Sequence, residues 1–188
     1  EYRRQRQMCI RDRPKIPKKV NQLIISNRFD WEKRPNLSLD FAYILKKRNP
    51  DLRIVVTTSR PKFTSNKKWL LELAEGMARD KIIEIHAGLT KMQYHHLLAQ
   101  SKVMLTNSIE ENFGYCIAEA LVYNTYPVAR NDLSHPELLE NDSRLLYNDE
   151  DEVVDKVETL LTSTFDVSRY ANKYYESLIK IVQIIKAS

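Results

Sequence analysis

Glycine is scarce in this sequence, and its scarcity excludes several kinds of nucleotide site. The 188 residues include only three glycines, Gly76, Gly88 and Gly114. A dinucleotide-binding turn needs several glycines close together, and a P-loop needs glycines shortly before a Lys. Neither spacing occurs, and no Gly-x-Ser-x-Gly nucleophile elbow is present. The sequence therefore argues against a dehydrogenase, a P-loop NTPase and an α/β-hydrolase.

Cysteine and long apolar runs are also rare. Two cysteines, Cys9 and Cys116, lack the spacing of a metal motif and are too few for a disulfide framework. No apolar run approaches the roughly 20 residues that a membrane-spanning helix requires. The polar first residues are not followed by the apolar segment of a secretory signal. We therefore expect a cytoplasmic protein with no membrane span, no metal and no bound cofactor.

Positive charge is present, but it is concentrated at the start of the chain. The formal net charge is +5. Residues 1–13 contain five arginines against Glu1 and Asp12, so the remaining residues are close to a net charge of +2. This first segment has no apolar periodicity, and it resembles translated adapter sequence at the end of an assembled metagenomic gene. We expect residues 1–13 to be a non-native or disordered basic head, and we place the folded domain in residues 14–188.

Apolar runs rich in β-branched residues alternate with segments of helical spacing in the rest of the chain. The runs predicted to be strands are residues 20–26, 52–57, 82–86, 103–106, 126–129 and 145–147. The segments predicted to be helices are residues 36–47, 67–77, 90–100, 115–122, 136–139, 153–161 and 170–185. Strands that are apolar on both faces and alternate with helices indicate a covered parallel sheet. The predicted fold is α/β, a doubly wound parallel sheet of about six strands with helices on both faces.

The loop after the first predicted strand carries two cations. In a doubly wound sheet, ligands lie beyond the carboxyl ends of the strands. Arg28 and Lys33 occupy such a position, five residues apart. An Arg can hold a phosphate through two parallel hydrogen bonds, and a Lys acts as a point charge. The pair predicts a diphosphate site, although taken alone it also fits two solvated loop cations.

The loop after the fourth predicted strand carries two carboxylates around a turn that enters a helix. Glu111 and Glu119 lie eight residues apart in this segment. Backbone N–H groups at the start of a helix can hold phosphate oxygens. Glu119 falls among apolar helical residues, where a carboxylate needs a partner such as a ribose hydroxyl. The alternative is an ordinary exposed helical glutamate.

Together the two loops resemble the C-terminal, donor-binding domain of retaining glycosyltransferases with a GT-B fold and a Glu-x7-Glu motif. Arg-x4-Lys follows the first strand, and Phe-Gly, Glu-Ala and Pro-Val follow in that family's order between residues 112 and 128. The resemblance runs from about residue 20 to residue 161. It implies the Rossmann-like half of a GT-B fold that uses a UDP- or GDP-hexose as co-substrate. We expect the N-terminal acceptor domain to be absent from this chain, which would then be inactive when isolated.

The resemblance also implies roles for residues at matching positions. Arg28 and Lys33 match positions that contact the donor diphosphate, and Glu111 matches one beside the donor sugar, so these three are the expected catalytic residues. Glu119 matches the residue that binds the nucleotide ribose. His86 is added because it ends the third predicted strand. The other expected donor-binding residues are Asn112, Phe113, Gly114 and Tyr115.

The chain departs from the family pattern at several positions where glycine is usual. Ser26 or Asn27, Asn112 and Asn124 stand at such positions, and Asn is the residue other than Gly that best tolerates a positive φ. Residues 129–137 replace a small, Gly-rich loop. This stretch and residues 27–33 are similar to transferases that mannosylate queuosine in tRNA and to phage enzymes that glycosylate modified DNA bases. That similarity implies a nucleic-acid acceptor.

Two other functions remain open from the sequence. A non-catalytic module that binds nucleic acid or protein, derived from a glycosyltransferase domain, would have no affinity for nucleotide sugars. A nucleotide-sugar epimerase of the same fold would need carboxylates and histidines from two domains. The remaining residues suggest packing or surface roles. Among them we expect Trp31 to anchor its loop, His95, His96 and Cys116 to pack, and Lys67 and Lys68 to form a solvated face.

Overall fold

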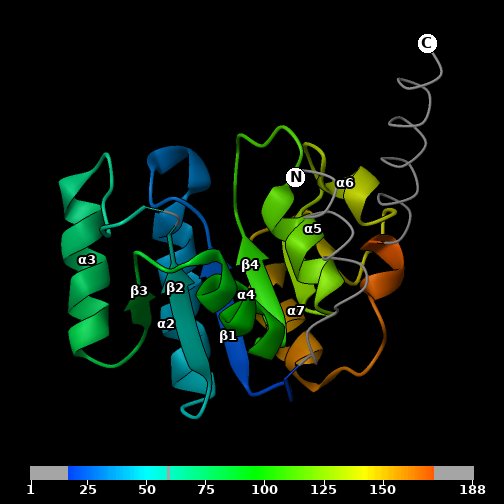
Figure 1. The fold of residues 1–188 in the computed structure, drawn as a ribbon, viewed down its shortest axis with the longest axis horizontal. Coiled ribbons are helices and arrows are strands. Elements are labelled where there is room, and N and C mark those ends of the chain that lie inside the picture. The colour runs from blue at the N-terminus through cyan, green and yellow to red at the C-terminus, as the bar shows by residue number, and fades with distance from the viewer. Residues whose placement is uncertain (1–16, 59, 172–188) are drawn as a thin grey trace.

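A parallel six-stranded sheet forms the centre of the protein (Figure 1). The computed structural model describes residues 17–58 and 60–171. The order of the strands across the sheet is β3-β2-β1-β4-β5-β6, and every pair is parallel. The strands are β1 (Gln22–Ser26), β2 (Arg53–Thr57), β3 (Glu84–His86), β4 (Val103–Thr106), β5 (Tyr126–Arg130) and β6 (Leu146–Tyr147). The predicted doubly wound α/β fold is therefore confirmed.

Helices cover both faces of this sheet. The helices are η1 (Trp31–Lys33), α2 (Pro35–Arg48), α3 (Lys68–Arg79), α4 (Lys91–Gln100), α5 (Tyr115–Val122), α6 (His135–Leu138) and α7 (Glu152–Thr162). Behind the sheet in Figure 1, α2 contacts α3 and α7, whereas α4 and α5 lie in front. Since both faces are covered, adjacent strand residues that point to opposite faces are both buried, as Leu23 and Ile24 in β1 illustrate with 0% exposure.

Element boundaries agree closely with the sequence pattern, with one short helix that the pattern did not predict. Thr90 caps α4: its side-chain oxygen accepts from the Gln93 N–H, and the Gln93 side chain accepts from the Thr90 N–H. The turn η1 was not predicted. It leads into α2 through Arg34, whose φ is 47°. The expectations for residues 1–13 and 172–185 lie outside the described residues.

The order of the strands creates a crevice at one edge of the sheet. The chain runs from β1 outward to β2 and β3, and then returns to place β4 on the other side of β1. The connections from two neighbouring strands run in opposite directions here, so the loops that follow these strands leave a space between them. Such a place is called a topological switch point, and ligands bind there. The loops after β1 and β4 are the two that carry the predicted site residues. No helix among the described residues is long and apolar enough to span a membrane.

A partly buried lysine, Lys19, lies just before β1, near the opposite edge of the sheet. The Lys19 ammonium donates to the Ser101 carbonyl oxygen at 2.7 Å and to the Thr125 hydroxyl at 2.7 Å. Both partners are uncharged, so nothing compensates the charge that is removed from water. Burial therefore lowers the pKa of Lys19 from its usual value to about 7.

This lysine makes the stability of the fold depend on pH. Above about pH 7 the folded chain releases a proton from Lys19 that the unfolded chain retains up to about pH 10.4, so the free energy of unfolding rises with pH. We expect the rise to approach about 1.4 kcal/mol per pH unit between about pH 7 and pH 9, relative to a Lys19→Met variant. Urea unfolding of both proteins at the two pH values measures it. If the free energy of unfolding changed with pH equally in the two proteins, the lowered pKa of Lys19 would be contradicted.

Candidate functional site

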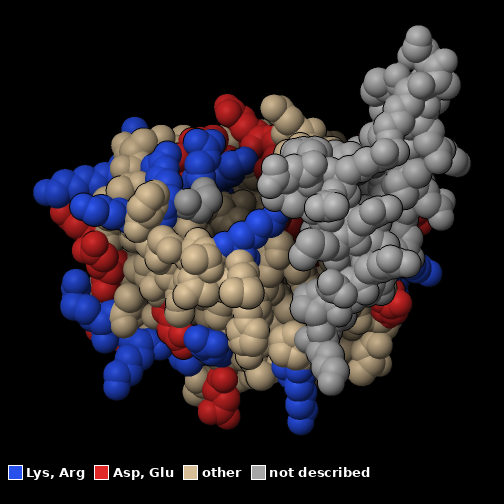
Figure 2. Space-filling model, viewed as in Figure 1, with Lys and Arg blue, Asp and Glu red and all other residues tan. Residues whose placement is uncertain are grey.

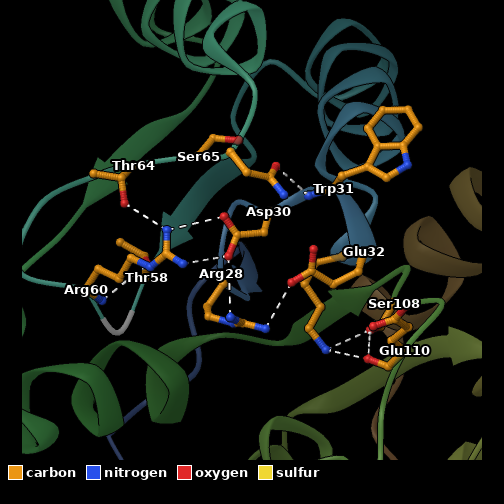
Figure 3. Close-up of polar contacts among 12 residues, drawn as sticks. Arg28, Asp30, Trp31, Glu32, Thr58, Arg60, Thr64, Ser65, Ser108 and Glu110 are labelled. Atoms are coloured by element: carbon orange, nitrogen blue, oxygen red, sulfur yellow. Dashed lines mark hydrogen bonds and ion pairs between the residues drawn. The ribbon is translucent and has the colours of Figure 1, made fainter.

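The loop after β1 presents Arg28 as part of a network of charged side chains (Figure 3). The Arg28 guanidinium donates to Glu32 at 3.0 Å and lies 3.5 Å from a carboxylate oxygen of Asp30. Arg60, from the loop after β2, donates to both oxygens of the same Asp30 at 2.7 and 3.2 Å. The Asp30 side chain is only 6% exposed, whereas that of Arg28 is 49% exposed. Arg60 therefore neutralises Asp30 and leaves Arg28 accessible.

Lys33 joins this loop to the loop after β4. Its ammonium donates to the Ser108 hydroxyl at 2.9 Å, to the Glu110 carbonyl oxygen at 2.6 Å and to a Glu111 carboxylate oxygen at 3.2 Å. An ammonium has three donors, so these acceptors satisfy all of them. An anion that binds Lys33 must replace one of the three. Lys33 and Glu111, two of the three expected catalytic residues, are therefore in direct contact.

The start of α5 follows a turn that Glu111 and Gly114 build together. The second carboxylate oxygen of Glu111 accepts from the Gly114 N–H at 3.1 Å. Gly114 has a φ of 84° and is the N-cap of α5, and no side chain caps the helix there. Backbone N–H groups in the first turn of an uncapped helix are available to an anion. The predicted phosphate-binding backbone is thus positioned at the switch point.

A cavity of about 420 Å³ opens between these loops. This volume is within the range of small-molecule sites. Three of the predicted residues line it, namely Arg28, Tyr115 and Glu119. The remaining lining residues are Ser26, Asn27, Thr57, Thr58, Leu89, Lys91, Tyr94 and Cys116. The sequence had indicated the strands whose ends form this cavity, but it had not indicated Thr58, Lys91 or Tyr94.

Glu119 lies on the cavity wall, beside residues of α4. Its carboxylate is 3.6 Å from Nε2 of His95, a buried nitrogen that has no hydrogen-bond partner within residues 17–58 and 60–171. The His95 ring also packs between Tyr94 and Tyr123, with ring centroids 5.6 and 5.4 Å apart. His95 is thus a packing residue, as expected, but the sequence gave no sign of its contact with Glu119. Burial, together with the nearby Glu119 charge, raises the pKa of Tyr94, so its hydroxyl stays protonated.

The other predicted residues lie around the cavity rather than in its wall. Lys33 and Glu111 connect the two loops, and the Phe113 and Tyr115 rings are 4.9 Å apart beside the start of α5. His86 lines a neighbouring groove and is 3.3 Å from Glu84. The groove shares only Leu89 with the cavity.

Cys116 and His135 have environments that limit their chemistry. Burial raises the pKa of the Cys116 thiol to about 12, so it remains protonated although it lines the cavity. His135 is 1% exposed, and Nδ1 lies 3.1 Å from the Arg130 carbonyl oxygen. Burial lowers the pKa of His135 and favours its neutral form. In the described part of the chain, no group of three or more His, Cys, Asp or Glu side chains could hold a metal ion.

Solved structures share this architecture. TarM superposes with a TM-score of 0.67 at 17% identity, over 89% of this chain and 33% of TarM. The C-terminal domain of a glycosyl transferase group 1 family protein (LpcC) from Francisella tularensis gives a TM-score of 0.66 at 16% identity, over 84% of this chain and 87% of that domain. Pneumococcal O-GlcNAc transferase GtfA, in complex with UDP and GlcNAc, gives a TM-score of 0.56 at 19% identity, over 85% of this chain and 30% of GtfA.

These likenesses concern the fold, and the chain spans about a third of the length of TarM and GtfA. They confirm the prediction that it forms the Rossmann-like half of a GT-B fold. No curated protein matches its sequence. Residues 8–183, which include both loops of the site, match the family described as Glycosyl transferases group 1. This chain therefore belongs to the glycosyl transferases group 1 family.

Proposed function

We propose that this domain is the donor-binding half of a retaining glycosyltransferase with a UDP- or GDP-hexose as co-substrate. The observation that carries the proposal is the convergence of two sequence-distant loops on one cavity. Arg28 comes from the loop after β1, and Tyr115 and Glu119 come from the helix after β4, yet all three line the same space. Cations, the start of a helix and a carboxylate are groups that suit a nucleoside diphosphate.

Each part of the donor has a counterpart in the proposal. The diphosphate lies between Arg28 and the first turn of α5, with Lys33 exchanging one of its present acceptors for a phosphate oxygen. The ribose hydroxyls donate to Glu119 on the cavity wall. The hexose lies toward Glu111 and Asn112, where the side chain of Asn112 can influence the choice of sugar.

The chemistry proposed for this chain is electrostatic. During transfer, the bond between the anomeric carbon and the diphosphate breaks while the acceptor oxygen bonds to that carbon and gives its proton to the leaving diphosphate. Negative charge grows on the leaving diphosphate, and positive charge grows on the sugar ring. Donors fixed in advance at a site of developing charge lower the barrier without further reorganisation. Arg28, Lys33 and the start of α5 serve this purpose, and the carboxylate of Glu111 is placed to stabilise the ring.

The proposal needs a second, N-terminal domain to hold the acceptor hydroxyl. The printed descriptions of GtfA and of a S. aureus TarM variant include UDP, which supports a UDP-sugar as one candidate donor. The resemblance of residues 27–33 and 129–137 to nucleic-acid-modifying transferases supports an acceptor hydroxyl on a modified base, in the cytoplasm. Without the acceptor domain, we expect this chain to bind donor weakly and to turn over little.

Calorimetric titration with UDP, GDP, UDP-glucose and GDP-mannose tests the proposal. We expect one nucleotide family to bind in the micromolar to millimolar range, because the cavity is already formed without a ligand. The nucleotide that binds identifies the base of the donor. If none of the four binds at millimolar concentration, the proposal fails. If a structured RNA binds under those conditions, the chain is instead a non-catalytic nucleic-acid-binding module.

A further inference from the structure

Both tryptophans of the chain lie together on the surface, next to the candidate site. Trp31 in η1 is 46% exposed and Trp69 at the start of α3 is 48% exposed. Their ring centroids are 6.5 Å apart in an edge-on arrangement. An anchoring tryptophan would bury its ring, so the expected anchor role of Trp31 does not account for this exposure. Half-exposed rings can still contact a flat partner.

Lysines and an arginine are close to Trp69 in the sequence. Residues 60–69 contain four cations and no Asp or Glu, and the cations are Arg60, Lys62, Lys67 and Lys68. The three lysines are exposed. Figure 2 shows Lys and Arg side chains on this side of the molecule, around the start of α3 and the adjoining loops. We call residues 60–69 together with Trp31 the basic–aromatic rim.

Helix stability does not explain the lysines of the rim. The first turn of α3 contains no acidic residue, although acidic side chains are favoured there and cations are disfavoured by the helix dipole. Lys68 pairs with Glu72 at 3.3 Å, but the two side chains are 89% and 62% exposed, so the pair stabilises the helix little. Residues that lower the stability of a helix and make no strongly stabilising contact are typical of a binding surface.

The rim is held in place and continues into the cavity. The backbone N–H of Trp31 donates to the Asn66 side-chain oxygen at 3.1 Å, and the Arg60 guanidinium donates two hydrogen bonds to the Asp30 carboxylate. The loops after β1 and β2 are therefore joined at two points. Thr58, two residues before the rim, lines the cavity. A ligand on the rim would lie beside the proposed donor without competing for the same residues.

We propose that the basic–aromatic rim binds single-stranded nucleic acid. Bases stack on Trp31 and Trp69, and backbone phosphates pair with Lys62, Lys67 and Lys68. Every base presents a flat π face that can stack on an aromatic ring, and exposed cations attract the backbone phosphates. An acidic peptide would use only the cations. A membrane surface would need more apolar area, and Trp69 is the only large apolar side chain exposed within residues 60–69.

This inference deepens the proposed function by naming the acceptor class and placing the acceptor beside the donor, and it rests on that function only for the transfer step. Binding itself is testable without any donor. Since the chain contains no other tryptophan, intrinsic fluorescence reports directly on the two rings of the rim. The probes are oligo(U) and oligo(dT), titrated at several salt concentrations between about 50 and 200 mM.

We expect the oligonucleotides to quench tryptophan fluorescence and the double variant Lys67→Gln/Lys68→Gln to bind about tenfold more weakly. The slope of log K against log salt should fall by about 1.4 in that variant, because two single-strand phosphate contacts are lost. The matched control is Lys47→Gln/Arg79→Gln, which removes the same charge from exposed positions away from the rim. Trp69→Phe should retain most binding, and Trp69→Ala should not.

Three results would overturn the inference: no quenching by either oligonucleotide, equal weakening in the control variant, or equal quenching by polyglutamate or anionic vesicles. A parallel titration with UDP and GDP keeps this test separate from the proposed function. If nucleotides bind and oligonucleotides do not, only the proposal for the rim is refuted. If oligonucleotides bind and nucleotides do not, the proposed donor site is refuted and the proposal for the rim stands.

Discussion

Replacing Glu119 with alanine should weaken the binding of the preferred nucleoside diphosphate at least tenfold, a loss of about 1.4 kcal/mol. The proposed ribose contact consists of hydroxyl groups that donate to a carboxylate, and hydrogen bonds to charged groups contribute about 1.5–3 kcal/mol. The Glu119→Ala variant removes this acceptor from the cavity wall. Isothermal titration of the wild type and the variant measures the difference.

The variant should keep the fold, which makes a loss of binding interpretable. Glu119 has a partly exposed side chain, and its contact with His95 is 3.6 Å long, so little stability depends on it. Alanine is the best helix former, which suits a position inside α5. Glu75→Ala, at an exposed position of α3, is the matched control and should bind as the wild type does. Undiminished nucleotide binding by Glu119→Ala would refute the ribose role.

The sequence was sufficient for the fold because hydrophobic burial is a local, periodic property. The residues of β4 are all buried, and in the sequence they form an apolar run with no polar interruption. Parallel pairing of such runs follows from the helices between them. The turn η1 escaped prediction because it depends on Arg34, a residue type that rarely adopts a φ of 47°.

Replacement of family glycines by Asn gave a mixed result. Asn124 has a φ of 53°, as expected for a residue in a glycine position. Its side chain also accepts from the Val167 N–H at 2.9 Å, so asparagine adds a contact that glycine could not make. Asn112 does not have a positive φ, so the tolerance of asparagine for that conformation is not used there. The sequence could not distinguish the two positions because the conformation depends on the surrounding turn.

The candidate site was predicted one loop at a time, and the contacts between loops were not predicted. Arg28 and Glu119 were identified, and both line the cavity. That Arg60 would hold Asp30, or that His95 would contact Glu119, depends on how segments about 25–30 residues apart meet in space. No spacing rule covers such pairs, since each partner is an ordinary residue in its own segment.

Gly114→Ala should be the most destabilising single substitution in the site, lowering the free energy of unfolding by about 2–3 kcal/mol. Gly114 has a φ of 84°, where a side chain costs about 1–2 kcal/mol. A Cβ there would also lie 2.6 Å from a methyl group of Leu138, a residue that is 2% exposed and has little room to move. Gly114→Ala should also displace the Gly114 N–H, which donates to the Glu111 carboxylate, so nucleotide binding should weaken as well.

Gly76→Ala is the matched control, because it adds the same methyl group in the middle of α3. Gly76 has no positive φ, and a Cβ there would meet its nearest neighbour, Arg79, at an ordinary distance of 3.7 Å. In a helix interior this change should stabilise the fold by about 0.5–1 kcal/mol. Urea unfolding of the two variants should therefore give changes of opposite sign. Equal effects would mean that the turn before α5 imposes no special backbone conformation, which would remove the structural basis for an anion site there.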